Sequence, residues 1–438
     1  MLEISKMDTG PCRLFLKLEL MNPGGSIKDR IGISMIEEAE KRGDIKSGDT
    51  LVEATAGNTG LGLALVAAQK GYHLILVLPD KMSQEKIFNL RAMGAEVVLT
   101  RSDVGRGHPE YYQDLGRRIA EEKGAYFINQ FGNPDNPLAH ETSTAPEIFE
   151  QLDGKVDAIV LGVGSSGTVS GISKYLQEHS PHTEIIIADP VGSIVADYVN
   201  TGEFGDSSSW LVEGIGEDFI PSIADFTCAT KGYSISDAES FSTARELLRK
   251  EGMLTGSSTG TLLCAALKYC REQTGEKRVV TLACDTGNKY LSKLFNDFWL
   301  EDQGFIKREP HGDLRDLIGR PHDERATITV GPTDVLTTAH NRLRNAGFSQ
   351  LPVMEEGELV GVVTEDAIIQ YTFGKPELMA ATVGEAMQTA FIRLEQDTSV
   401  NNLVAMLSVQ PYAAVMDGDN FLGLITRSDV LNHLRKQM

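Results

Sequence analysis

Short apolar runs alternate with segments of helical periodicity over residues 1 to about 303. Residues 60–70, 85–93 and 237–251 have the spacing of amphipathic helices. The apolar runs, which predict buried parallel strands, are residues 74–78, 96–99, 158–161, 184–188 and 278–282. This alternation predicts an α/β fold with a mostly parallel sheet, in which ligands bind at the carboxyl ends of the strands.

The C-terminal part contains an internal repeat of strand, turn, strand and helix. Its two copies have a constant offset of 62 residues, so that Val353 matches Val415 and Thr364 matches Thr426. Two units this small usually bury a shared face by packing as a pseudo-symmetric pair. A charged stretch with Gly and Pro interruptions precedes the repeat and predicts a linker. The predicted boundaries are 1–303 for the α/β part, 304–325 for the linker and 326–438 for the pair, with repeats at about 326–375 and 383–438.

Composition and charge exclude several classes of protein. The net charge of −21 argues against nucleic acid or an anionic membrane as the main partner, because both attract basic patches. We find no signal-peptide pattern and no apolar run long enough to span a bilayer, which predicts a cytoplasmic protein. The five cysteines form no Cys-x-x-Cys pair, so we expect reduced thiols, no disulfide framework and no metal site.

A lysine occupies an unusual position near the start of the chain. Residues 22–25 read Asn-Pro-Gly-Gly, a tight turn, and an amphipathic helix is predicted behind them. With Ser26 as the helix cap, Lys28 falls in the first helical turn, where the helix dipole disfavours a cation by ~0.3–1 kcal/mol. A lysine that must act as a free amine, in a Schiff base with a carbonyl, benefits from that environment. The alternative is a solvated surface lysine.

Three glycine-rich loops each open a predicted helix. Residues 162–168 follow a strand, and their amides and hydroxyls can converge on an anion. The same loop fits G-x-G-x-x-G, and Asp189 ends the next strand, so a nicotinamide oxidoreductase stays open as an alternative. Residues 53–62 offer amides and polar side chains suited to a carboxylate, and residues 256–261 have the same character.

Together these motifs resemble the fold-type II pyridoxal-phosphate enzymes of the family that includes cystathionine β-synthase and cysteine synthase. NPGGSIKDR resembles the family's cofactor-lysine motif, ATAGNTG its substrate-carboxylate loop, GSSGT its phosphate loop and GSSTG its pyridine-nitrogen loop. The resemblance covers nearly the whole chain. It implies two parallel-sheet α/β subdomains followed by a tandem CBS-domain pair.

The resemblance also assigns individual residues. Lys28 would form the Schiff base with pyridoxal 5′-phosphate and would later carry the α-proton of the substrate. Ser258 would face the pyridine nitrogen, where a neutral hydroxyl suits expulsion of a β-leaving group over transamination. The other cofactor contacts would come from Asn58 at the 3′-oxygen and from Gly164, Ser165, Ser166, Gly167 and Thr168 at the phosphate. The substrate carboxylate would be held by Thr55, Ala56, Gly57, Asn58, Thr59 and Gln130.

Residues 213–221 and 189–193 resemble the cystathionine β-synthase branch of the family. This branch implies that L-serine and L-homocysteine give L-cystathionine and water, in the biosynthesis of cysteine. Cysteine synthase, which uses O-acetylserine and sulfide, is the alternative within the family, and hydrogen sulfide production stays open. The resemblance also implies a homodimer or a higher homo-oligomer.

The chain departs from the family pattern at several positions. Ala56 stands where the family usually has Ser, and Ser166 where it usually has Gly, so an unusual backbone angle at Ser166 would be costly. Gln130 is followed by Phe131, where this branch often has Tyr. No Gly-Asn-Thr-Pro segment and no His/Cys-bearing extension precedes Cys12, so we expect no haem of the kind found in the animal enzymes.

CBS domains commonly bind adenosine derivatives, with an Asp three residues after a Thr holding the ribose. The second repeat has Thr426 and Asp429, whereas the first has Thr364 and, in the Asp position, Ala367. We therefore expect one such site at most, with S-adenosylmethionine as the first candidate ligand. A dimerisation or stability module without a ligand is the alternative.

Overall fold

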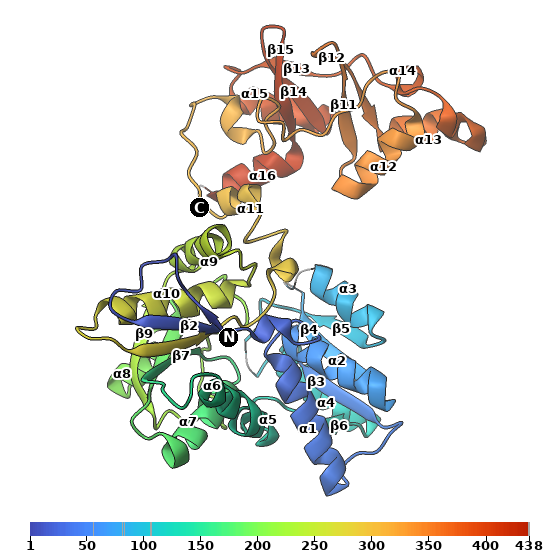
Figure 1. The fold of residues 1–438 in the computed structure, drawn as a ribbon. Coiled ribbons are helices and arrows are strands. Elements are labelled where there is room, and N and C mark those ends of the chain that lie inside the picture. The colour runs from blue at the N-terminus through green and yellow to red at the C-terminus, as the bar shows by residue number, and fades with distance from the viewer. Residues whose placement is uncertain (56, 81, 83, 106, 437–438) are drawn as a thin grey trace. The chain divides into compact units, whose positions relative to one another are not determined.

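The computed structural model describes every residue except 56, 81, 83, 106 and 437–438. Contacts divide the described chain into two units, Met1–Phe295 and Asn296–Met438 (Figure 1). Among the described residues, no helix combines the length and the apolarity that a bilayer span requires.

The first unit contains two sheets with helices between the strands. Its strands are β1 Leu2–Glu3, β2 Arg13–Lys17, β3 Thr50–Ala54, β4 His73–Pro79, β5 Glu96–Thr100, β6 Tyr126–Phe127, β7 Ala158–Gly162, β8 Glu184–Pro190, β9 Ala229–Ile235 and β10 Arg278–Leu282. Its helices are η1 Glu19–Met21, α1 Lys28–Arg42, α2 Asn58–Lys70, α3 Gln84–Ala92, α4 Tyr112–Lys123, α5 Asp135–Ala139, η2 His140–Thr144, α6 Ala145–Gln151, α7 Gly167–His179, α8 Val195–Thr201, α9 Asp237–Glu251, α10 Ser257–Arg271 and η3 Gly287–Tyr290.

Both sheets are built mainly from parallel strands, which confirms the predicted α/β fold. The smaller sheet has the order β5-β4-β3-β6 and is wholly parallel. The larger has the order β1-β2-β10-β7-β8-β9, and only its β1–β2 pair is antiparallel. Parallel neighbours end at the same edge of a sheet, so the loops that follow these strands gather there.

Helices cover both faces of the smaller sheet (Figure 1). Successive strand residues face opposite sides, so Leu51 packs with residues of α1, α2 and α3, whereas Val52 packs against Ala120 of α4. Burial on both faces explains why its strands read as apolar runs rather than as an alternating pattern.

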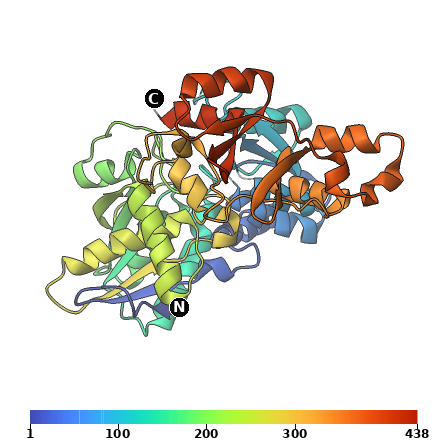
Figure 2. The same ribbon diagram turned by 90° about the horizontal axis from the view of Figure 1, so that it is seen from above.

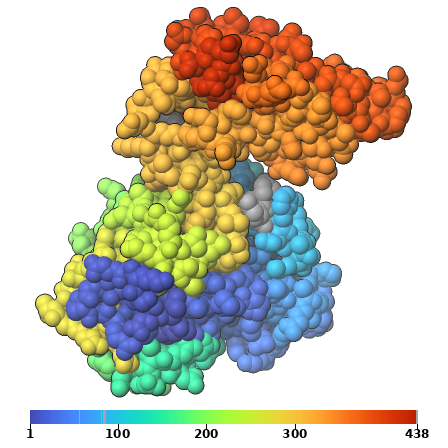
Figure 3. Space-filling view, turned by 45° about the horizontal axis from the view of Figure 1, so that its top comes forward, coloured from blue at the N-terminus to red at the C-terminus, as the bar shows by residue number. Residues whose placement is uncertain are grey.

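The larger sheet is covered by α10, which packs along β7, β8 and β10, while α9 packs on α10 (Figure 2). The N-terminal segment lies on the surface of this unit beside α9 and α10 (Figure 3). Ser5 N donates to Glu251 Oε1 at 2.9 Å, and Arg271 pairs with Asp8 at 3.2 Å.

The second unit holds the two predicted repeats. Its elements are α11 Asp297–Asp302, η4 Leu314–Leu317, α12 Leu336–Ala346, β11 Gln350–Glu355, β12 Glu358–Thr364, α13 Glu365–Thr372, η5 Pro376–Ala380, α14 Val383–Ala386, β13 Arg393–Glu395, α15 Val400–Val409, β14 Tyr412–Asp417, β15 Asn420–Thr426 and α16 Arg427–Lys436. The hairpins β11–β12 and β14–β15 each shift register at one point, after Val353 and after Val415. These two shifts occur at matching positions of the repeat.

Residues 304–325, predicted as a linker, are partly packed within the second unit. Leu314 and Leu317 of η4 are buried together with Leu403 and Val415 of the second repeat. This short helix therefore contributes to the core of that repeat. The charged residues around it are what made the segment resemble a linker in the sequence.

Candidate active site

A cavity of about 410 Å³ lies in the first unit, and each of the predicted motifs contributes to its wall. Lys28 reaches it from the start of α1, Asn58 from the start of α2, Gly167 from the start of α7 and Ser258 from the start of α10. Helix N-termini carry positive partial charge and free amides. The cavity is therefore suited to a ligand with more than one anionic group.

Lys28 is the first residue of α1, as the sequence predicts. The cap of this helix is Ile27 rather than Ser26, although the Ser26 hydroxyl still accepts from Lys28 N at 3.3 Å. Burial lowers the pKa of the Lys28 amine, against the opposing effect of nearby acidic groups that include Asp285 and Glu217. The geometry thus favours the free-amine interpretation over that of a solvated surface lysine.

A second lysine holds the turn that precedes Lys28. The side chain of Lys289 is buried, and its Nζ donates to Gly24 O at 2.9 Å and to Asn58 Oδ1 at 3.0 Å. Asp29 accepts from Gly24 N at 2.5 Å, and a Cβ at Gly24 would lie 2.5 Å from Asp29 Oδ1. A side chain at Gly24 would therefore displace the carboxylate that fixes the turn.

Arg30, two residues after Lys28, joins α1 to two other segments. Its guanidinium donates to Glu19 at 2.7 and 2.9 Å and to Glu147 of α6 at 2.8 and 2.7 Å. The side chain of Glu19 is 1% exposed. Bidentate pairs of this kind restrict orientation as well as position, so the helix that carries Lys28 is held firmly.

The predicted phosphate loop, Gly164 to Thr168, runs into the N-terminus of α7. Ser166 has φ +70°, a left-handed conformation that favours glycine, so the departure noted in the sequence coincides with a strained position. The Ser166 hydroxyl is buried and has no partner among the described residues. Ser165 is oriented by Asn136, whose Nδ2 donates to the Ser165 hydroxyl at 3.0 Å.

His140, which the sequence analysis did not select, lies behind this loop. It belongs to the π-helix His140–Thr144, and its Nε2 lies 3.3 Å from Thr168 Oγ1 while its Nδ1 lies 2.9 Å from Thr144 Oγ1. Burial and the charges of Lys28 and Arg30 lower the pKa of His140 well below its usual value. The ring is therefore neutral, with one donor and one acceptor nitrogen.

The predicted carboxylate loop is linked to Gln130 as expected. Thr59 Oγ1 donates to Gln130 Oε1 at 2.7 Å, and Gln130 Nε2 donates to Ala54 O at 3.1 Å. The Thr55 hydroxyl accepts from Gly57 N at 3.1 Å. These side chains line the cavity.

Ala56 and Asn58 also belong to the predicted carboxylate loop. Ala56 lies outside the described residues, so its predicted contribution stays a prediction. Asn58 Nδ2 donates to Asp285 Oδ2 at 2.8 Å, and its oxygen accepts from Lys289. One amide hydrogen of Asn58 is left for the cofactor oxygen to which the resemblance assigns it.

A carboxylate between two lysines forms another part of the wall. Glu213 hydrogen-bonds Lys86 and accepts from Lys293 Nζ at 2.7 Å. Burial acts to raise the pKa of Glu213, but the two ammonium groups outweigh it, so the pKa lies below its usual value. In the sequence, Glu213 stands out only as the first residue of the segment that resembles the cystathionine β-synthase branch.

Asp189 does not occupy the position that a nicotinamide site would need. The residue is fully buried, and its carboxylate accepts from Ala196 N at 2.9 Å, close to the start of α8. It therefore satisfies backbone groups of the fold and does not face the cavity, whose lining omits it. This contact removes the acidic residue on which the oxidoreductase alternative depends.

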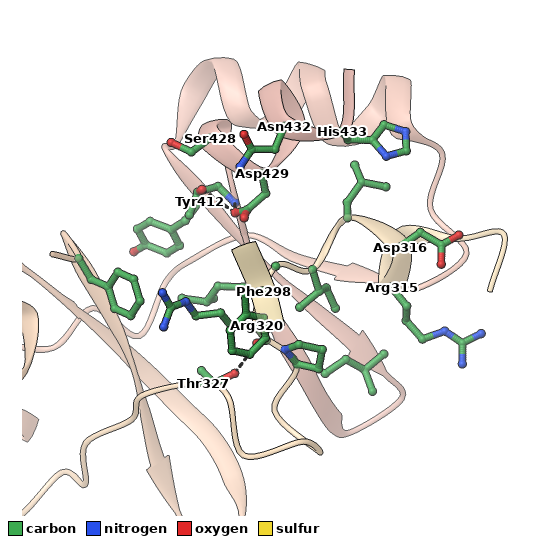
Figure 4. Close-up of a pocket in the computed structure, with 18 of the residues that line it drawn as sticks. Phe298, Arg315, Asp316, Arg320, Thr327, Tyr412, Ser428, Asp429, Asn432 and His433 are labelled. Carbon is green, nitrogen blue, oxygen red and sulfur yellow. Dashed lines mark hydrogen bonds between the residues drawn. The ribbon is translucent and has the colours of Figure 1, made fainter. Parts of the chain in front are cut away.

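The second unit has its own cavity, of about 1,110 Å³, to which both repeats contribute. Asp429 lies in its wall on α16, close to Asn432 and His433 (Figure 4). Asp429 Oδ2 accepts from Thr426 N at 2.7 Å and from Thr426 Oγ1 at 2.6 Å. The predicted Thr–Asp pair is thus formed, with Asp429 held by Thr426.

Comparison with known proteins gives this geometry a family. Residues 2–285 match the model described as pyridoxal-phosphate dependent enzyme, and residues 323–374 and 383–436 each match the CBS domain model. The first unit is therefore a pyridoxal-phosphate-dependent enzyme fold, followed by two CBS domains.

Individual relatives narrow the family further. The chain is 36% identical to the cystathionine β-synthase of Dictyostelium discoideum, over 97% of this chain and 88% of that protein. Among solved structures, an O-acetylserine dependent cystathionine β-synthase from Helicobacter pylori superposes with a TM-score of 0.61 at 38% identity, over 67% of this chain and 94% of that one. A hydrogen sulfide-producing enzyme from Fusobacterium nucleatum gives the same TM-score of 0.61 and identity of 38%, over 66% and 95%. The chain belongs to the cystathionine β-synthase family.

The residues of the cavity fit the cofactor of this family, pyridoxal phosphate. Lys28 supplies an amine whose pKa is lowered by desolvation, which an aldehyde requires. The loop at the N-terminus of α7 supplies amides and the unpaired buried hydroxyl of Ser166, which suit a phosphate. Ser258, in the first turn of α10, presents a neutral hydroxyl to the same cavity.

Proposed function

We propose that this protein catalyses the replacement of the β-hydroxyl of L-serine by the thiol of L-homocysteine, giving L-cystathionine and water. The observation that carries the proposal is the convergence of Lys28, the phosphate loop and the carboxylate loop on one cavity. The names of the relatives support the choice of product.

The chain's own residues have distinct tasks in this reaction. Bound pyridoxal phosphate would supply the electron sink that lets the α-carbon of an amino acid lose its proton. Lys28 Nζ would hold that proton, since its lowered pKa leaves the amine able to accept it. Thr55, Thr59 and Gln130 would hold the carboxylate of the first amino acid.

Lys86 and Lys293 offer a place for the second amino acid. Both lysines bond Glu213, so their ammonium groups gather at this part of the cavity wall. Homocysteine carries a carboxylate of its own, which ammonium groups would attract. The second substrate would then enter with its thiol toward the β-carbon of the first.

An assay of substrate pairs tests the proposal. Purified protein is given serine plus homocysteine, O-acetylserine plus homocysteine, and O-acetylserine plus sulfide, and the thioether and cysteine products are measured separately. We expect the first pair to have the highest kcat/KM. Dominance of O-acetylserine plus sulfide would show a cysteine synthase instead, and the Helicobacter pylori relative makes O-acetylserine plus homocysteine a specific second candidate.

We further infer that the second unit binds an adenosyl ligand next to Asp429, with S-adenosylmethionine as the first candidate. Asp429 lines the cavity, and the guanidinium of Arg320 there lies over the rings of Phe298 and Phe348, at 5.5 and 4.7 Å (Figure 4). Calorimetry with S-adenosylmethionine should give binding that Asp429→Asn weakens at least about 10-fold, the loss of a hydrogen bond to a charged group. Equal affinity in both proteins would place the ligand elsewhere.

We also propose a homodimer or higher homo-oligomer, as in the family resemblance. Sedimentation of the purified protein across a range of concentrations tests this. A monomer at all concentrations would contradict it.

A further inference from the structure

Glu217 also lines the cavity of the first unit, but the steps proposed for the reaction do not use it. Its backbone is held at both ends by Ser193: Glu217 N donates to the Ser193 hydroxyl at 2.9 Å, and that hydroxyl donates to Glu217 O at 3.0 Å. Ile194 N also donates to Glu217 O, at 3.1 Å. The residue is therefore fixed in position rather than carried on a loose loop.

The preceding residue joins this segment to the cofactor cradle. Gly216 N donates to Val163 O at 2.7 Å, directly before Gly164 of the phosphate loop. Gly216 has φ +90°, and a Cβ there would lie 2.6 Å from the Pro190 ring. The turn that presents Glu217 is thus anchored to the strand end that leads into the phosphate loop.

The carboxyl of Glu217 has no hydrogen-bond partner among the described residues, although it lines the same cavity as Lys28 and Tyr112. The carboxylate of Glu213, by contrast, accepts hydrogen bonds from two lysines. A polar group that is fixed, turned to a ligand cavity and left unpaired is a candidate to pair with the ligand itself.

The charges around Glu217 favour its neutral form. Burial raises its pKa well above the usual value, and the nearby carboxylates of Asp218 and Asp189 raise it further, while only Lys28 acts in the opposite direction. Tyr112 is a further titratable neighbour, and burial together with Glu217 raises the pKa of its phenol well above the usual value. These effects favour the protonated carboxyl of Glu217, which is the form that can donate a proton.

We propose that Glu217 donates this proton to the β-oxygen of serine as the bond between that oxygen and the β-carbon breaks. Water leaves, and Glu217 becomes a carboxylate. Homocysteine then forms the new sulfur–carbon bond, and its thiol proton passes to Glu217, which restores the acid. One proton is given and one is taken back, so the cycle needs no external acid, base or redox partner.

This inference rests on the proposed function and adds a selectivity for the leaving group. Hydroxide is a poor leaving group and departs readily only when protonated, whereas acetate leaves as a stable anion. Glu217 is thus needed for serine and much less for O-acetylserine. A purely structural role of Glu217 would affect both substrates equally.

The test compares Glu217→Gln with the wild-type protein, with homocysteine as the nucleophile and either serine or O-acetylserine as the first substrate. General acid catalysis is typically worth 10²–10⁴-fold, so kcat/KM for serine should fall by about 100-fold or more. For O-acetylserine the fall should stay below about 10-fold. Asp206→Asn, which removes an exposed carboxylate that does not line the cavity, is the matched control and should affect both substrates only slightly.

A second measurement does not depend on turnover. The infrared difference spectrum between wild-type and Glu217→Gln protein, without cofactor at pH 7, should contain the C=O band of a protonated carboxylic acid, and its absence would overturn the inference. If the wild-type protein is active and Glu217→Gln loses equally with both substrates, or loses nothing with serine, the inference is overturned and the proposed function stays intact. Wild-type protein that uses neither substrate would overturn the proposed function and this inference together.

Discussion

Replacing Arg30 by Met tests how the helix bearing Lys28 is held. Arg30 donates twice to Glu19, whose side chain is 1% exposed, and twice to Glu147, whose side chain is 38% exposed. The exposed pair is worth at most about 1 kcal/mol because water screens it. Removing Arg30 also leaves the Glu19 charge buried and uncompensated, and breaking such a pair costs about 3–5 kcal/mol. Most of the effect of Arg30→Met should therefore come through Glu19.

The full chain is unfolded by heat and by urea. Fluorescence monitors the unfolding transition of the first unit. Arg30→Met should lower the unfolding free energy by about 3–5 kcal/mol. The double variant Glu19→Gln/Arg30→Met should recover part of the loss, because the buried charge is gone. If the double variant loses as much unfolding free energy as Arg30→Met, or more, the buried charge of Glu19 does not govern the stability of this helix.

Three further outcomes concern residues in and behind the wall of the cavity. Lys28→Ala should abolish the yellow colour given by pyridoxal phosphate, and borohydride reduction of the wild-type protein should label the peptide containing Lys28; a label on another lysine would contradict the assignment. His140→Ala should weaken cofactor affinity about 10-fold, in a fluorescence titration of cofactor-free protein, because Thr168 loses a hydrogen-bond partner worth about 1.4 kcal/mol; unchanged affinity would show that Thr168 does not need it. Burial raises the pKa of Glu53 to about 8 from a usual 4.5. The protonated carboxyl therefore stabilises the fold fully below pH 4.5, and this contribution to the unfolding free energy is lost as the pH rises to 8. Glu53→Gln should accordingly reduce the fall in Tm between pH 5 and 8, and an identical fall in both proteins would refute this.

The parts of the fold that local sequence determines could be predicted. The run at β4 is apolar because both faces of the sheet are covered, and Gly24 and Gly25 stand where a turn must approach Asp29 and Lys289 closely. The cavity motifs were found for a similar reason, since each is a continuous stretch in which a strand ends, glycine allows a turn and a helix begins.

The short helix at Leu314–Leu317 could not be predicted from the same reasoning. Its two leucines stand among charged residues, and only contact with Leu403 and Val415, about 90 to 100 residues later, makes them core residues. His140 is a similar case: a lone histidine in a helical stretch gives no periodic signal, and its role depends on Thr168 coming to lie beside it.

The acidic residues of the cavity show the same limit. Glu213 and Glu217 are four residues apart in one loop and have the same intrinsic pKa. Two lysines from distant segments lower the pKa of Glu213, whereas burial, Asp218 and Asp189 raise the pKa of Glu217. Their difference therefore arises only in the folded chain. Two identical side chains with opposite pKa shifts in one cavity can take different roles, one binding as an anion and one donating a proton. We expect Lys293→Met to raise the pKa of Glu213 without changing that of Glu217. That result would trace the separation of the two roles to the individual contacts of each carboxyl.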